Sequence, residues 1–425
     1  MEPCKYSASE ALNEIRAGRL TAEAYMSSCL DRIAAREPTV QAWACLDPEY
    51  ALRQARLLDR AQSRGPLHGV PVGFKDVFDT AHLPTQYNSA IYRGHRPLWD
   101  AACVALTQRA GGIVMGKTVT TEFAYRFPGP TRNPHHVAHT PGGSSSGSAA
   151  AVADFMVPIA LGTQTGGSTI RPASYCGIVG YKPSFNLINR AGLKFVAESL
   201  DHVGVLARSV EDVALFVHAV SDLALPSFAQ APSHAPRIGL YQQPRGTVED
   251  PALWVNLDRA ARTLAQNGAQ VTACVLADAY NTMNADHLAI IDFEAARAFA
   301  FEYQNHRDKL SPLILENIEN GWRCSRERYD LAISNAVGYR ARLAEHFNHF
   351  DFLLTPAASG EAPAGITGTG NSMYNRIWTL FGVPCVTVPA WVGTSGLPIG
   401  IQIVGPYGSD VQTLYWAEWV HRLLR

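Results

Sequence analysis

The sequence predicts a single large α/β domain, in which helices cover both faces of a mixed, twisted β-sheet. From residue 65 onward, segments with helical periodicity alternate with short apolar segments that are typical of strands. The run Val157–Thr163 carries no charged side chain, as expected of a strand buried on both faces. No internal repeat or low-complexity tract interrupts the 425 residues, of which 47% are hydrophobic, so the chain can bury one large core.

Four regions of this domain differ in their pattern. Residues 1–64 form a helical N-terminal arm, 65–222 the core, 223–350 a mainly helical region, and 351–425 the last strands and a closing helix. The predicted helices are 9–17, 22–35, 49–61, 100–110, 148–155, a short one from Ser168 or Thr169, 251–267, two long segments within 278–350, and 410–424. The predicted strands are 70–76, 113–115, 157–163, 237–241, 271–276, 352–354, 385–388 and 400–404.

The charge balance argues against nucleic acid and anionic membranes as partners. Lysine and arginine number 36 and aspartate and glutamate 37, so no positive excess is available to hold a polyanion. No segment reaches the roughly 18 apolar residues of a membrane span, and the N-terminus lacks the apolar centre of a signal peptide. The eight cysteines are scattered without the spacing of a metal site or a disulfide framework. We expect a cytoplasmic protein with reduced thiols and a small-molecule partner.

Three sequence motifs suggest three different chemistries, and the first is a phosphate-binding loop. Gly111–Thr118 matches G-x-x-x-x-G-K-[ST], which would make Lys117 a phosphate ligand. Such a loop follows a strand and is open and glycine-rich. Here a helical segment precedes Gly111, and Ile113–Met115 has the pattern of a strand. We therefore expect Gly116 and Lys117 to end a strand.

The second motif is a nucleophile elbow. Gly143–Gly147 matches G-x-S-x-G with Ser145 at its centre, which would suggest an α/β-hydrolase. An elbow needs a hydrophobic strand before it, whereas the preceding RNPHHVAHTPG is polar and contains proline. This context disfavours Ser145 as the nucleophile.

The third pattern combines two serine-containing loops with a distant lysine. PGGSSSGS spans Pro141–Ser148, TQTGGSTIR spans Thr163–Arg171, and Lys75, one of only six lysines, lies in an apolar segment. This pattern resembles the amidase signature family, in which a lysine and two serines form the catalytic set. The resemblance covers most of the chain, is strongest over residues 116–183, and has weaker support in FDFLLTPAAS and FGVPCVTVPAW.

The resemblance implies cleavage of a C–N amide bond with Ser168 as the nucleophile. The reaction also needs hydrogen-bond donors for the developing oxyanion. Ser168 follows a predicted buried strand and two glycines, which permit unusual backbone conformations, and it lies at the start of a predicted short helix. We expect the backbone N–H groups of Thr165, Gly166, Gly167 and Ser168 to converge as an oxyanion hole.

By the same resemblance, Ser144 is a bridging serine that passes a proton between the nucleophile and Lys75 and that follows a cis peptide bond. Lys75 is then the general base. A free lysine has a pKa near 10.4, and only burial or a positive neighbour brings that pKa toward 7. The apolar segment around Lys75 supplies the burial. Because neighbours in a strand point to opposite faces, Asp76 is not expected to face Lys75.

Further candidates for the pocket are less specific. Phe123, Tyr125, Gln164 and Trp378 are substrate-binding candidates, although aromatic residues in core strands are also ordinary packing residues. Gln164 stands where an acidic residue is common in the family, and this departure weakens any expectation of a fixed charge beneath the nucleophile loop.

No metal or cofactor is expected. His135, His136 and His139 lie in a loop without an obvious carboxylate partner, and Cys176 is better explained as a buried structural thiol than as a nucleophile. The arginines of residues 323–328 face either an acidic substrate or solvent, and the sequence leaves both open.

The leading functional hypothesis is an amidohydrolase acting on a small molecule. One alternative is the glutaminase-type A subunit of a glutamyl-tRNA amidotransferase, and another is a non-catalytic binding protein on the same fold. The presence of Lys75, Ser144 and Ser168 argues against the second alternative. Residues 278–350 are expected to shape the pocket, so the substrate is not readable from the sequence. A homodimer is the expected assembly.

Overall fold

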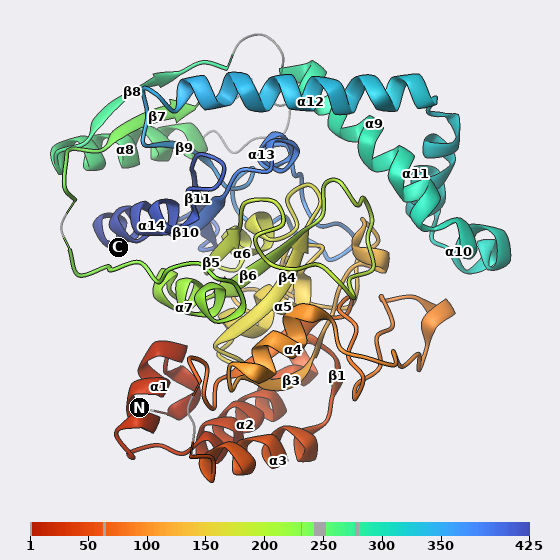
Figure 1. Ribbon diagram of the computed structural model, residues 1–425, viewed down its shortest axis with the longest axis vertical. Coiled ribbons are helices and arrows are strands. Elements are labelled where there is room, and N and C mark those ends of the chain that lie inside the picture. The colour runs from red at the N-terminus through yellow and green to blue at the C-terminus, as the bar shows by residue number, and fades with distance from the viewer. Residues whose placement is uncertain (1, 63–64, 231, 242–251, 277–279) are drawn as a thin grey trace.

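The computed structural model contains one continuous sheet of eleven strands covered by helices, which confirms the predicted α/β class (Figure 1). The structure describes residues 2–62, 65–230, 232–241, 252–276 and 280–425. The strand order is β1-β3-β2-β4-β6-β5-β10-β11-β9-β7-β8. The strands are β1 Trp43–Leu46, β2 Pro71–Lys75, β3 Ile113–Thr118, β4 Ile159–Gln164, β5 Val179–Lys182, β6 His202–Ala207, β7 Arg237–Tyr241, β8 Gln270–Cys274, β9 Phe352–Pro356, β10 Cys385–Val392 and β11 Pro398–Val404.

The sheet is mixed, as predicted. β2 runs parallel to both β3 and β4, and β7 runs parallel to β8 and β9. The central strands β4, β6, β5, β10, β11 and β9 pair antiparallel in that order. The parallel arrangement of β2 and β4 matters for the site, because it brings the carboxyl ends of both strands to the same edge.

Helices lie on both faces of the sheet, and side chains of successive strand residues enter different cores. Phe74 and Leu161 belong to the larger core, together with residues of α1, α4, α7, α8 and α14, whereas Ala160 belongs to the core beneath α2, α3 and α5. The helices are α1 Ala8–Arg16, α2 Ala22–Val40, α3 Pro48–Asp59, α4 Ala102–Arg109, α5 Ser146–Ala153, α6 Ile170–Tyr175, α7 Val210–Val220, α8 Ala252–Gln266, α9 Tyr280–Ala298, α10 Ala300–Asn305, α11 Pro312–Arg323, α12 Arg326–His346, α13 Arg376–Phe381 and α14 Asp410–Leu424.

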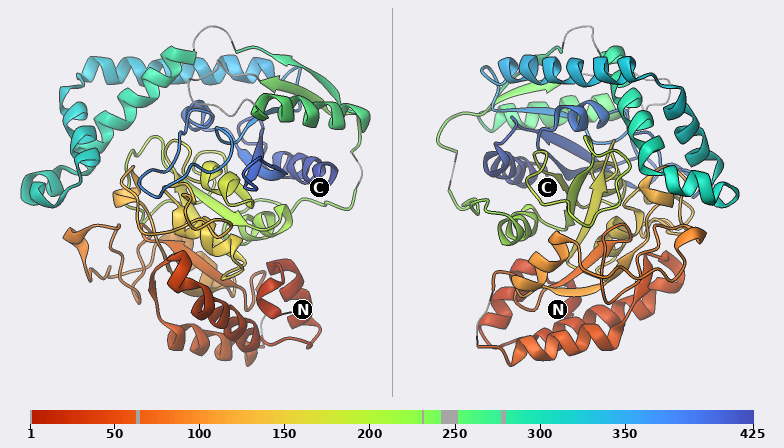
Figure 2. Two further views of the ribbon diagram at one scale, coloured as in Figure 1. Left: turned by 180° about the vertical axis from the view of Figure 1, so that it is seen from behind. Right: turned by 45° about the vertical axis from the view of Figure 1, so that its right-hand side comes forward.

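The periphery of the molecule consists of two helical layers at opposite ends of the sheet. The N-terminal helices α1 to α3 lie at one end, and α9 to α12 form a long arm at the other (Figure 2). The two long helical segments predicted within 278–350 are in fact four helices. Among the described helices, none is long and apolar enough to cross a membrane.

Element prediction succeeded where a cap or breaker marks an end. Ser7 and Glu10 form a capping box at the start of α1, and Thr21 and Asp47 accept hydrogen bonds from the first turns of α2 and α3. The predicted 410–424 matches α14 in both bounds. The elements β1, β5, β6, α7 and α13 were not predicted. The predicted end of α2 at residue 35 is five residues too early, since the helix continues through Pro38 to Val40.

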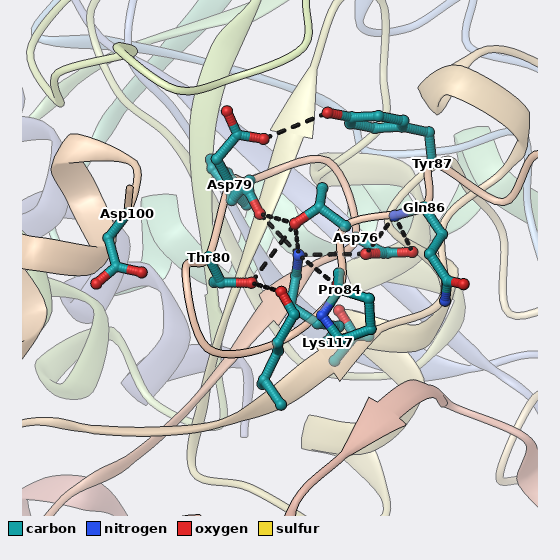
Figure 3. Close-up of polar contacts among 12 residues, drawn as sticks. Asp76, Asp79, Thr80, Pro84, Gln86, Tyr87, Asp100 and Lys117 are labelled. Carbon is teal, nitrogen blue, oxygen red and sulfur yellow. Dashed lines mark hydrogen bonds and ion pairs between the residues drawn. The ribbon is translucent and has the colours of Figure 1, made fainter. Parts of the chain in front are cut away.

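A second buried lysine holds the segment that follows β2. The amine of Lys117 on β3 donates hydrogen bonds to the carbonyl oxygen of Phe78 at 2.7 Å and to the hydroxyl of Thr85, and it pairs with the Asp76 carboxylate at 3.2 Å (Figure 3). Both charged side chains are buried, and burial lowers the pKa of Lys117 and raises that of Asp76. Lys117 therefore anchors the 76–87 segment, and the phosphate-loop motif is a buried strand.

Replacing Lys117 tests this anchor. Lys117→Met leaves the Asp76 carboxylate buried without its cation, so we expect the free energy of unfolding to fall by about 3–5 kcal/mol. Urea denaturation measures the change. Lys5→Met is the matched control, because the Lys5–Glu2 pair is exposed and its loss should leave the urea midpoint unchanged. Equal stability of the two variants would contradict an anchoring role.

Candidate active site

A cavity of about 460 Å³ lies at the carboxyl end of β4. The segment that follows the strand, Thr165–Ser168, forms part of its wall. Ser168 lines the cavity and is 8% exposed, while the residues beneath it are buried. The opposite wall comes from α9 and α11, which contribute Ile291 and Leu313 among others. The helical region thus shapes the cavity, as expected from the sequence.

Strand register brings Lys75 beneath this wall. In the parallel pair β2 and β4, Phe74 lies opposite Leu161, so the next residues along each strand reach the same edge. Lys75 is the last residue of β2, and its amine donates hydrogen bonds to the hydroxyls of Ser144 and Thr163, each at 2.7 Å. Two residues from distant parts of the chain are therefore in direct contact with the predicted base.

The environment of Lys75 favours the uncharged amine. The side chain is fully buried, and burial lowers the pKa of Lys75 well below its usual value. The negative charge of Asp201 acts in the opposite direction and the positive charge of Arg171 adds to the lowering. The neighbouring Asp76 faces Lys117, as the alternation of strand residues requires. Lys75 thus has the electrostatic setting that a lysine base needs.

Ser144 lies in the turn before α5. The Gly143–Ser144 peptide bond is cis, as the resemblance implied. The N–H of the next residue, Ser145, donates to the carbonyl oxygen of Ser168 at 3.3 Å, so the two serine loops are in contact. The Ser145 hydroxyl is fully buried and bonds to the backbone N–H and carbonyl of Thr163 on β4. The Ser145 hydroxyl is therefore hydrogen-bonded to the backbone of β4, and the nucleophile-elbow interpretation is not supported.

Hydrogen bonds to two carbonyl oxygens hold the backbone of residues 165–168. His287 donates to the Thr165 carbonyl at 2.7 Å, and Thr379 donates to the Gly166 carbonyl at 2.8 Å. Within the described chain, no residue accepts a hydrogen bond from the backbone N–H of Gly166, Gly167 or Ser168. These N–H groups remain available to an oxyanion.

The role of the two glycines differs from the expectation. Neither Gly166 nor Gly167 has a positive φ. A Cβ on Gly167 would instead come within 2.4 Å of the Asn375 amide oxygen, so the absence of a side chain is required by space. Gln164 accepts hydrogen bonds from the N–H groups of Thr169 and Ile170, at 2.9 and 3.0 Å. A neutral amide thus caps the short helix α6, which begins two residues after Ser168.

The predicted pocket residues separate into two groups. Tyr125 lines the cavity, and burial raises its pKa to about 12. Phe123 and Trp378 lie in aromatic clusters of the core, Gln164 lies beneath the nucleophile loop, and none of these three lines the cavity. They hold the walls in place.

The other candidate residues have structural partners. His135 and His139 contact the carbonyl oxygens of Cys176 and Ala362 at 2.9 and 2.7 Å, and the described residues contain no cluster of three metal-ligating side chains. Burial raises the pKa of the Cys176 thiol, which makes it unreactive.

The arginines of residues 323–328 do not line the cavity. Arg323 and Arg326 are exposed on the outer helical layer, and Arg326 pairs with Asp330 at 2.8 Å. Arg328 pairs with Asp286 at 2.7 Å. The sequence left open whether these arginines face an acidic substrate or solvent. In the structure they form ion pairs within the outer helical layer and do not face the cavity.

Residues at the site that were not predicted include Thr163, Asp201, His287 and Arg376. Thr163 was inside the quoted motif, so its hydroxyl next to a buried strand end was a usable signal. Asp201, His287 and Arg376 carried no such sequence signal, because each reaches the site from a distant segment of the chain. The Asp201 carboxylate accepts a hydrogen bond from the Thr165 hydroxyl, and burial raises the pKa of Asp201 to about 6.

Known proteins resemble the chain over almost its whole length. It is 31% identical to the A subunit of the glutamyl-tRNA(Gln) amidotransferase of Chlamydia pneumoniae, over 96% of this chain and 93% of the relative. A solved chain from a vestigial protein complex, connected with the evolutionary origins of an s-triazine catabolic enzyme, superposes with a TM-score of 0.90, at 28% identity and 98% coverage of both chains. The peptide amidase of Stenotrophomonas maltophilia gives a TM-score of 0.85, at 28% identity, with 99% of this chain and 97% of the other covered.

The family model described as Amidase matches residues 24–414, which is most of the chain. This match, the relatives and the shared fold agree with the two serine loops and the buried lysine at the edge of the sheet. The chain belongs to the amidase signature family.

Proposed function

We propose that the chain hydrolyses a C–N amide bond of a small molecule through an acyl-enzyme on Ser168, with Ser144 as proton shuttle and Lys75 as general base. The observation that carries the proposal is the buried Lys75 amine, 2.7 Å from the Ser144 hydroxyl and within the layer of residues beneath the cavity wall. This amine bonds to two hydroxyls and, within the described chain, to no carboxylate. An ion pair therefore does not explain its burial, whereas a lysine base needs this environment.

In the acylation step, the Ser168 hydroxyl oxygen attacks the amide carbonyl carbon. Its proton passes to Ser144, whose own proton passes to the neutral Lys75 amine. The tetrahedral intermediate places a negative charge on the former carbonyl oxygen. The N–H groups of Thr165, Gly166, Gly167 and Ser168 are the proposed donors to this charge, and one such donor contributes roughly 3 kcal/mol in other hydrolases.

Collapse of the intermediate breaks the C–N bond. The proton held by Lys75 returns through Ser144 to the leaving nitrogen, which departs as ammonia or an amine. Water then attacks the Ser168 ester by the same route in reverse: Ser144 and Lys75 take its proton, the ester C–O bond breaks, and the proton returns to the Ser168 oxygen. The products are a carboxylic acid and the free enzyme.

A glutaminase subunit is the second candidate, because the A subunit of the amidotransferase matches the chain end to end. That activity would show glutamine hydrolysis that depends on a second chain. Purified protein that cleaves a small amide by itself, with no gain from added partner subunits, would favour the stand-alone enzyme. A cytoplasmic location and a homodimeric assembly are further predictions. Cell fractionation tests the location, and light scattering tests the assembly.

Two serine variants test the assignment of the nucleophile. Ser168→Ala removes the attacking oxygen, so we expect no measurable turnover with any amide. Ser145→Ala is the matched control: it removes a hydroxyl that bonds only to Thr163, and it should keep most of kcat. Ammonia release assays measure both. The opposite ranking of the two variants would restore Ser145 as nucleophile.

The pH dependence of kcat/KM tests Lys75. The neutral amine is the active form, so kcat/KM should rise with pH as Lys75 loses its proton, and then level off. Because burial lowers the pKa of Lys75, the plateau should begin well below pH 10.5. Asp201→Asn removes the negative charge that favours the protonated amine, and it should move the rising limb to lower pH.

A limb near pH 6 that disappears in Asp201→Asn would assign the titration to Asp201 instead, since the pKa of that carboxyl is about 6. A rate that falls as pH rises would exclude a lysine base. The profile of kcat/KM in the wild-type and variant enzymes, from pH 5 upward, separates these outcomes.

A further inference from the structure

Glu122 is a buried carboxylate that no cation balances. It begins the short turn Glu122–Ala124, is 4% exposed, and forms no ion pair with a lysine or arginine of the described chain. Its two carboxylate oxygens lie 3.3 and 3.2 Å from the backbone nitrogen of Ser311, which donates to them. Burial raises the pKa of Glu122, and hydrogen bonding by Ser311 lowers it. Because burying a charge is costly, the group that this carboxylate holds matters.

That group is the start of α11. Ser311 is the residue that precedes the helix, and its own side chain does not cap the first turn. In a capping box, a glutamate three residues into the helix accepts the N–H of the capping residue. Here that position is Ile314, and Glu122 supplies the carboxylate from a segment 189 residues away. The helix dipole favours a negative charge at this end. Glu122 therefore caps α11 from outside the helix.

Both sides of this contact continue into the wall of the cavity that contains Ser168. Ala124, Tyr125 and Arg126 follow Glu122 and line the cavity on one side. Leu313 follows Ser311 by two residues and lines the cavity from α11. The contact between Glu122 and α11 therefore joins two walls of one cavity.

The turn is also tied to the serine loop. The Thr121 N–H donates to the Ser144 carbonyl oxygen at 3.2 Å, and the Thr121 hydroxyl donates to the Tyr125 carbonyl oxygen at 3.0 Å. Phe123 and Ala124 have φ values of 48° and 59°, a region that residues other than glycine rarely adopt. Such a turn persists only where its surroundings fix it. Through this turn, the position of α11 is linked to the loop that carries Ser144.

Other contacts dock the helical arm away from the cavity (Figure 2). The ring of Phe299 packs on that of Phe123, with centroids 5.1 Å apart, and Glu302 of α10 pairs with Lys194 at 2.6 Å. None of these four residues lines the cavity. They hold the end of α9 and α10, whereas the contact of Glu122 lies next to a residue of the cavity wall.

We propose that Glu122 is a positioning residue that docks the start of α11 on the turn after β3, so that Leu313 closes the cavity and limits the size of the substrate. This proposal rests on the amidase function proposed above and specifies how that site selects its substrate. The substrate class is a compact amide that fits the closed cavity of about 460 Å³. Without the carboxylate, the start of α11 opens more often and bulkier amides enter.

Two amides that differ only in a terminal ring test the size limit. We expect the wild-type enzyme to cleave butyramide with a higher kcat/KM than 4-phenylbutyramide. Glu122→Ala should lower the ratio of these two values by roughly tenfold, because it removes a hydrogen bond to a charged group. Glu122→Gln keeps an acceptor for the Ser311 N–H and should change the ratio less. Glu319→Gln is the control, since this carboxylate of α11 pairs with Arg307 and does not line the cavity.

A proline tests the same contact from the other side, and it serves where Glu122→Ala fails to fold. Ser311→Pro removes the N–H that Glu122 accepts. The φ of −66° at Ser311 and the ψ of 138° at Leu310 suit a proline, so the backbone need not change. We expect the same fall in the ratio.

A double variant shows whether Glu122 acts through Leu313. Leu313→Ala opens the wall directly and should lower the ratio by itself. If both residues set one wall, Glu122→Ala combined with Leu313→Ala should lower the ratio no more than the larger single effect. Independent, multiplicative effects of the two changes would overturn the proposal.

Two measurements need no turnover. Hydrogen–deuterium exchange over residues 313–323 should be on the order of tenfold faster in Glu122→Ala and Ser311→Pro, and unchanged in Glu319→Gln. Calorimetric titration with butyrate and 4-phenylbutyrate measures the size limit as binding. The wild-type protein should bind butyrate more tightly, and Glu122→Ala should narrow the difference.

The outcomes separate this proposal from the hydrolase function. If no amide is cleaved, but Glu122→Ala speeds the exchange and narrows the difference in binding, the positioning role stands and the hydrolase function fails. If amides are cleaved and the ratio stays at its wild-type value, the hydrolase function stands and the proposal is overturned, even where the urea midpoint falls, because a merely structural carboxylate changes stability without changing selectivity. Unchanged binding selectivity, without any cleavage, overturns both.

Discussion

The site depends on one buried contact, the amine of Lys75 between the hydroxyls of Ser144 and Thr163. Burial of an amine without a carboxylate contact favours its neutral form, since a buried unpaired charge costs several kcal/mol. The parallel register of β2 and β4 places this amine at the strand ends, directly beneath the cavity. The rest of the site, from the two serine loops to the capped helix α6, is built around that edge.

Three lysines are buried in the described chain, and two of them, Lys75 and Lys117, lie on the neighbouring strands β2 and β3 in different environments. Lys117 contacts the Asp76 carboxylate and a carbonyl oxygen, so its charge is balanced and its role is to hold a loop. Lys75 donates to two hydroxyls instead, and the base role proposed for it requires that difference. The strand alternation that sends Asp76 toward Lys117 also keeps this carboxylate away from Lys75.

The cavity lies between the 165–168 backbone and helices from the C-terminal half of the chain. The 165–168 backbone supplies donors, and its carbonyls are fixed by His287 from α9 and by Thr379 from α13. α9 also contributes His287 and Ile291 to the cavity lining, and α13 contributes Arg376. Elements that hold the 165–168 backbone therefore also line the cavity.

The sequence by itself determined the fold class, the family and most helices with caps, because local patterns and contiguous motifs carry those signals. The same motifs are the source of the roles proposed for Lys75, Ser144 and Ser168. Short strands such as β5 and β6, which contain glycine, lysine and histidine, become strands only through pairing. Tertiary structure alone decided that Phe123 and Trp378 pack in the core and which arginines line the cavity. Those outcomes depend on contacts between segments far apart in the chain, and such contacts leave no trace in local sequence.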